Sequence, residues 1–124
     1  MKFGYTILYV KSVKEALAFY EKAFGLKTKM LHETGQYGEL DTGETTLAFG
    51  SSLLASLNGF KADAPSEDPT FEIAFVTEDV EAAYQTAIAA GAVELKKPSK
   101  KPWGQTVGYV RDPNGFLVEI ASPM

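Results

Sequence analysis

Hydrophobic and polar positions alternate in short runs that surround two longer helical patterns. Residues 5–10 (YTILYV) form a strand-like run, and residues 13–24 place apolar side chains at the three- and four-residue spacing of a helix. Ser12 precedes this helix, with Glu15 three positions on as in a capping box, and Gly25 follows it where a left-handed residue is favoured. The sequence therefore predicts a strand followed by a capped helix.

The same order of elements occurs a second time along the chain. A strand-like run at residues 72–77 precedes Asp79, a helical pattern at residues 80–90, and Gly91. Asp79 is a competent N-cap, as Ser12 is in the first half. Because the spacing between matching residues is nearly constant, we expect two copies of one module.

Further strand-like runs follow each helix, and in each half the last two are joined by a turn. They lie at residues 27–33, 37–41 and 45–50 in the first half, and at residues 92–96, 106–111 and 116–121 in the second. Each half is thus predicted to be a β-α-β-β-β module, which makes the fold class α+β. We expect one module at residues 1–50, a linker at residues 51–69 with a short helix at residues 52–57, and a second module at residues 70–124.

Side-chain alternation along each strand predicts which residues face away from the helices. In the first module this face carries Tyr5 and Ile7, and Ala48 stands on a later strand. In the second module the matching places hold Glu72 and Glu119. One module therefore offers two acids where the other offers a phenol and a methyl group.

Composition narrows the classes of function. The formal net charge of −4 disfavours nucleic acids and anionic lipid as partners. Cysteine is absent and His32 is the only histidine, which excludes disulfides and zinc sites built from cysteines or from several histidines of one chain. The first residues lead directly into a strand-like run and no apolar stretch approaches the length of a membrane span. We expect a cytoplasmic protein that binds a small molecule.

Two segments resemble the glyoxalase / bleomycin resistance protein / extradiol dioxygenase superfamily, which has the vicinal oxygen chelate fold. They are residues 13–20 (VKEALAFY) before Gly25, and residues 109–119 (YVRDPNGFLVE). The resemblance extends over almost the whole chain. It implies two β-α-β-β-β modules that form a curved, cup-like mixed sheet, a homodimer, and a ligand site inside the cup.

In glyoxalase-type members, the resemblance implies metal ligands at the positions of Tyr5, Ala48, Glu72 and Glu119. Only Glu119 is the usual type of ligand at its place. Ala48 has no donor atom, and a neutral phenol such as that of Tyr5 is a poor ligand. We therefore expect no cofactor, with a divalent metal ion held by Glu72 and Glu119 as the alternative.

Several candidate residues have two interpretations. Glu72 and Glu119 form a site for a cationic group or supply a general base, or they are two solvated carboxylates; sharing one site would raise one pKa. Trp103 lies in a segment (PWGQ) that resembles the tryptophan-bearing stretch of bleomycin-type drug-binding members. With Tyr5, Tyr9 and Tyr109 it forms an aromatic wall for a flat or cationic ligand, or these rings pack between the modules or across a dimer. Lys96, Lys97, Lys100 and Lys101 form a basic cluster that contacts an anionic group or, as the flanking Pro98 and Pro102 favour, lies in a solvated loop.

The leading hypothesis is a small-molecule binding protein of the bleomycin-resistance type, which sequesters an aromatic or cationic ligand without a bound metal. The ligand-binding candidates are Tyr5, Ile7, Ala48, Glu72, Trp103, Tyr109 and Glu119. The alternative is a metal-assisted lyase or isomerase of the glyoxalase kind that uses Glu72 and Glu119 as catalytic residues.

Overall fold

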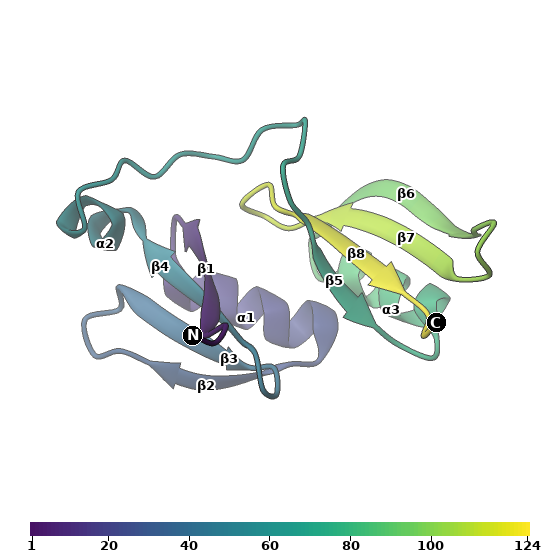
Figure 1. Cartoon of the computed structure of the whole chain (residues 1–124), viewed down its shortest axis with the longest axis horizontal. Helices are drawn as coiled ribbons and strands as arrows, with labels where there is room; N and C mark the ends of the chain where they lie inside the picture. The colour runs from purple at the N-terminus through teal and green to yellow at the C-terminus, as the bar shows by residue number, and fades with distance from the viewer. The chain divides into compact units, whose positions relative to one another are not determined.

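The computed structural model describes all residues from Met1 to Met124, and the chain divides into two compact units, Met1–Asp63 and Ala64–Met124. Each unit contains one four-stranded mixed sheet with a long helix packed on one face (Figure 1). The predicted α+β arrangement of two similar modules is therefore confirmed. None of the helices is long and apolar enough to span a bilayer.

The first unit has the strand order β1-β4-β3-β2. The strands are β1 (Tyr5–Val10), β2 (Lys27–Leu31), β3 (Tyr37–Asp41) and β4 (Thr46–Ser51), and the helices are α1 (Val13–Phe24) and α2 (Ser52–Leu57). Strands β1 and β4 pair in parallel, whereas the other neighbours are antiparallel. The core lies between α1 and the sheet, where the ring centroids of Tyr20 and Phe49 are 5.0 Å apart.

The second unit repeats this topology with the order β5-β8-β7-β6. Its strands are β5 (Ile73–Val76), β6 (Val93–Lys100), β7 (Thr106–Arg111) and β8 (Leu117–Ala121), and its helix is α3 (Val80–Ala89). The face under α3 buries Val118 and Ile120 of β8, as alternation predicts. Glu119 lies between them in sequence and therefore points to the opposite face.

Both long helices have the predicted caps. Ser12 accepts a hydrogen bond from the Glu15 amide at 3.2 Å, and Asp79 accepts one from the Ala82 amide at 3.0 Å. Gly25 ends α1 with a φ of 68°, the left-handed conformation that glycine adopts without a steric penalty. These local signals explain why the helix boundaries agree closely with the sequence pattern.

Strand β6 corrects one expectation from the sequence. The lysine-rich segment is not a loop, because β6 continues through Lys100 and pairs with β7. Pro98 lies in a register shift between Lys96 and Ser99, on a strand at the edge of the sheet, where a missing amide hydrogen does not break the pairing. Proline and clustered charge are typical both of loops and of edge strands, so composition alone does not distinguish the two, and the prediction of a loop was wrong.

Candidate functional site

The face of the second sheet away from α3 brings together Glu72, Tyr109 and Glu119. Tyr109 of β7 and Glu119 of β8 are registered partners, and the Tyr109 hydroxyl donates a hydrogen bond to Oε2 of Glu119 at 3.0 Å. Glu72 lies directly before β5, and its side chain is hydrogen-bonded to that of Glu119. The two acids that the alternation pattern placed on one face are thus in direct contact.

The contact between the acids changes their protonation. A hydrogen bond to Glu119, then burial, then the negative charge of Glu119 raise the pKa of Glu72 from 4.5 to about 7. The sequence predicts a raised pKa from like charge, whereas the hydrogen bond is the larger cause. The pair therefore holds one proton close to neutral pH, and its titration belongs to both groups together.

Tyr109 remains a neutral hydrogen-bond donor. Burial, then the hydrogen bond to Glu119, then the charges of the two acids raise the pKa of Tyr109 to about 12. The Glu119 carboxyl group thus accepts a hydrogen bond from Tyr109 and is also hydrogen-bonded to Glu72. The three side chains form a continuous hydrogen-bonded row in the order Tyr109, Glu119, Glu72.

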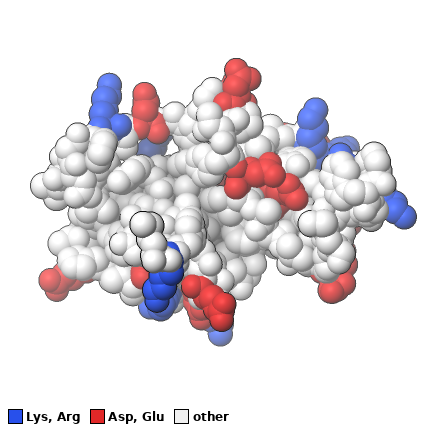
Figure 2. All heavy atoms as spheres, in the orientation of Figure 1, with Lys and Arg blue, Asp and Glu red and all other residues white.

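A pocket of about 450 Å³ opens on the same face. It is lined by Glu67, Pro69, Glu72, Leu95, Lys96, Tyr109, Arg111 and Leu117. Glu119 is not a lining residue itself but is hydrogen-bonded to two of them, Tyr109 and Glu72. Figure 2 shows acidic side chains over β5 and β8 and basic side chains over β6. The lining thus combines the acids Glu67 and Glu72, an aromatic ring, apolar side chains and two cations around a space sufficient for a small molecule, and Glu119 lies directly beside it.

The sequence pattern raised Lys96 only as part of a basic cluster, and it did not single out Arg111 or Leu117 as site residues. Arg111 is two positions after Tyr109 on β7, so alternation alone places it on the same face. Lys96 reaches this face through a register shift between Glu94 and Lys96 that makes it, instead of Leu95, the partner of Tyr109. Nothing in the sequence marks the position of that bulge.

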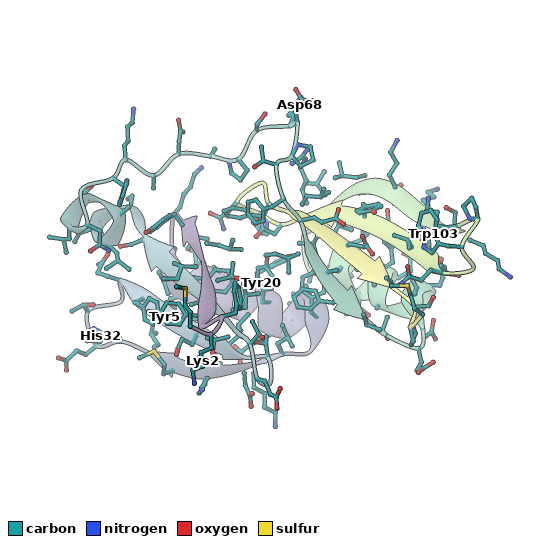
Figure 3. All side chains as sticks on the ribbon, in the orientation of Figure 1. Lys2, Tyr5, Tyr20, His32, Asp68 and Trp103 are labelled. Carbon is teal, nitrogen blue, oxygen red and sulfur yellow. The ribbon has the colours of Figure 1, made fainter.

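Trp103 lies on the loop that joins β6 to β7, at the end of the hairpin (Figure 3). Its side chain is 66% exposed, and its ring nitrogen donates a hydrogen bond to Oε1 of Gln105 at 2.9 Å. Trp103 is not among the residues that line the pocket. Within this unit the structure does not bring the tryptophan to the acid pair.

The remaining candidates, Tyr5, Ile7 and Ala48, belong to the first unit. Ile7 and Ala48 are registered partners across β1 and β4, and Glu39 of β3 flanks Ala48 on the other side. Ala48 is fully buried, so it has no exposed surface for a ligand, whereas Tyr5 is 60% exposed. The assignment of Tyr5, Ile7 and Ala48 to a ligand site stays a prediction.

Two further polar groups lie on strand β3 of the first unit. Burial, then the charge of Glu39, then Tyr5 raise the pKa of Tyr37. Glu39 and Tyr37 are two positions apart and share one face of the strand. The first unit therefore carries one acid and two phenols where the second unit carries the acid pair.

Comparison with known proteins agrees with this architecture. The family model of the glyoxalase-like domain matches residues 3–124, and the chain belongs to this family. It is 30% identical over 120 residues to the uncharacterized protein YraH of Bacillus subtilis, covering 91% of each chain. It is 26% identical over 125 residues to a probable lactoylglutathione lyase of Vibrio cholerae, covering 94% of this chain and 86% of the relative.

A solved structure shares the whole fold. A glyoxalase/bleomycin resistance protein/dioxygenase family enzyme from Burkholderia phytofirmans superposes with a TM-score of 0.84 at 20% identity, covering 100% of both chains. The fold of the present chain is therefore the vicinal oxygen chelate fold. The homodimer and the cytoplasmic location that we expect from the sequence stay predictions.

The donor atoms do not fit the four-ligand metal site that the resemblance implies. Ala48 contributes no donor and is fully buried, and Tyr5 offers only a phenol, which is a poor ligand when neutral. No group of three or more histidine, cysteine, aspartate or glutamate side chains lies close enough to hold a metal ion. We therefore derive the chemistry of the site from its own side chains.

Proposed function

We propose that the protein binds a small aromatic or cationic molecule in the pocket of the second unit, with its cationic group against Glu72 and Glu119. The observation that carries the proposal is the contact between these two carboxylates at the edge of the pocket, which raises the pKa of Glu72 to about 7. A cation can take the place of the proton on this pair, because either one neutralises the repulsion between the two acids.

The surroundings of the acid pair support an aromatic cation in particular. Tyr109 is half-buried in the pocket, and Leu95 and Leu117 add apolar surface on either side. An aromatic ring attracts cations to its face and stacks with other rings. The hydrogen bond from the Tyr109 hydroxyl already fixes the orientation of the Glu119 carboxylate, so little conformational entropy is lost when a ligand binds.

Replacement of a proton by a cation makes binding depend on pH. Below about pH 7 the incoming cation must displace the proton on the pair, whereas above that pH the proton is already gone. We expect benzylamine to bind more tightly at pH 8 than at pH 6 and to release a proton at the lower pH. Isothermal titration in two buffers of different ionisation enthalpy measures both effects.

A variant of the acid pair provides the decisive control. Glu119→Gln preserves the shape of the side chain and removes its charge, so we expect benzylamine binding at pH 8 to weaken at least about tenfold, the loss of a charge-assisted contact of roughly 1.5 kcal/mol or more. Glu78→Gln changes an exposed acid outside the pocket lining and serves as the matched variant. Equal affinities of the Glu119→Gln and Glu78→Gln proteins would refute the proposal.

The same pKa favours a second function, proton transfer by Glu72 in a lyase or isomerase. A general acid or base works best when its pKa is close to the operating pH, and the pKa of Glu72 is about 7. One relative is named a probable lactoylglutathione lyase. An assay for that activity, with and without added Ni²⁺ or Mn²⁺, tests this candidate; activity that survives Glu72→Gln would exclude Glu72 as the proton-transfer group.

A further inference from the structure

Lys96 and Arg111 lie on the same face of the sheet as Glu72 and Glu119, but on the strands toward its other edge. Lys96 and Tyr109 are registered partners across β6 and β7, and Tyr109 and Glu119 are partners across β7 and β8. The order across the face is therefore Lys96, Tyr109, Glu119. Since neighbouring strands lie about 5 Å apart, the main chains at Lys96 and Glu119 are separated by roughly 10 Å.

A second row repeats this order of charges. Arg111 of β7 is the registered partner of Leu117 on β8, and Glu72 lies just before β5, the strand next to β8. Both rows thus run from a cation on the β6–β7 side to an acid on the β8–β5 side, with Tyr109 and Leu117 between them. Figure 2 shows the same separation, with basic groups over β6 and acidic groups over β5 and β8.

The two cations are positioned for an anionic group. The guanidinium of Arg111 donates to the main-chain oxygens of Gly115 and Glu67, each at 2.9 Å. These bonds hold it at the pocket edge and use two of its five N–H donors. The side chain of Lys96 makes no hydrogen bond or ion pair, so its ammonium group is available.

We propose that the pocket takes a dipolar ligand, with its cationic group against Glu72 and Glu119 and an anionic group, such as a carboxylate, between Lys96 and Arg111. This inference rests on the proposed function and adds to it the second charge of the ligand. A ligand with both charges satisfies both ends of the pocket, whereas a simple cation leaves Lys96 and Arg111 facing an empty end. An amino acid with well-separated charged groups is the chemical class that fits.

Three probes built on one ring separate the contributions of the two charges. 4-(Aminomethyl)benzoate carries both charges at opposite ends of the ring, benzylamine carries only the cation, and benzoate carries only the anion. At pH 8 we expect 4-(aminomethyl)benzoate to bind at least about tenfold more tightly than benzylamine, and benzoate to bind most weakly. Amide shifts in NMR spectra of the full chain give the affinities even in the millimolar range.

Lys96→Met removes the free cation and keeps an apolar side chain of similar length. We expect this variant to bind 4-(aminomethyl)benzoate no better than benzylamine, because the anionic group loses the ammonium group of Lys96. Lys97→Met is the matched control, because Lys97 is its exposed neighbour and does not line the pocket. Unchanged amide spectra away from residue 96 show that the variant is folded.

The outcomes distinguish this inference from the proposed function. If benzylamine binds and depends on Glu119 but 4-(aminomethyl)benzoate binds no more tightly, the dipolar ligand is wrong and the cation site stands. If the advantage of 4-(aminomethyl)benzoate persists in Lys96→Met, the anionic group does not lie where we place it. If neither probe binds, both proposals fail.

Discussion

At the scale of single residues, the proton held by Glu72 and Glu119 links the stability of the protein to pH. The pKa of Glu72 in the folded state, about 7, lies above its ordinary value of 4.5. Between these values the folded protein binds more protons than the unfolded chain, so the contribution of this group to stability is complete below about pH 4.5 and is lost as the pH rises through 7.

The variant Glu72→Gln removes this dependence. We expect it to be more stable than the natural sequence at pH 8, because the repulsion between two ionised carboxylates is gone, and to show a smaller difference at pH 5. Urea denaturation at the two pH values measures the effect, with Glu78→Gln as the control acid outside the pair. If Glu72→Gln changes the free energy of unfolding by the same amount at pH 5 and at pH 8, the two acids do not share a proton.

At the scale of elements, each long helix lies close to a glycine on the sheet. A Cβ atom added at Gly38 of β3 would lie 2.8 Å from Cδ1 of Leu17 and 3.1 Å from Cγ1 of Val13, both on α1. A Cβ added at Gly108 of β7 would lie 3.2 Å from the ring of Tyr84 on α3. The helix in each unit therefore approaches the sheet where a strand lacks a side chain.

We expect Gly38→Ala to reduce the free energy of unfolding by about 1–3 kcal/mol, because buried Leu17 and Val13 leave no space for another methyl group. Gly4→Ala is the control, since a Cβ there meets nothing within 4 Å. Thermal or urea denaturation measures both. Equal stability of the two variants would show that α1 can move away from β3 at little cost.

Local signals explain which elements the sequence predicts well. The caps at Ser12 and Asp79 and the alternation in β1, β7 and β8 depend on near neighbours in the chain, so they are visible in the sequence. The extent of β6 depends on pairing with β7 across two register shifts. That pairing is tertiary, and a segment with two prolines and four lysines gives no local sign of it.

The same distinction holds for the candidate site. The acid pair and Tyr109 follow from alternation, whereas the position of Lys96 follows from a bulge that only the folded sheet reveals. Trp103 was selected because of its loop and its resemblance to drug-binding members, but its position depends on the path of the β6–β7 connection. Alternation along the strands therefore predicted where the acids lie, whereas residue type alone did not predict where Trp103 lies.

At the scale of the whole molecule, the two units share a topology but not a chemistry. The first unit has Tyr5 and an enclosed Ala48 at the places that match Glu72 and Glu119. Duplication thus preserved the sheet and the close approach of the helices at Gly38 and Gly108, whereas the acid pair occurs in one copy. We expect the proton-linked binding to belong to the second unit.

A proton shared by Glu72 and Glu119 near neutral pH underlies both the proposed binding and its dependence on pH. Carbon-13 NMR of glutamate side-chain carboxyls, followed from pH 4 to pH 9, tests for this proton most directly. We predict a carboxyl signal with an apparent midpoint near 7 in the natural sequence, and its loss in Glu119→Gln. Titration of every glutamate at ordinary values of about 4–5 would contradict the shared proton.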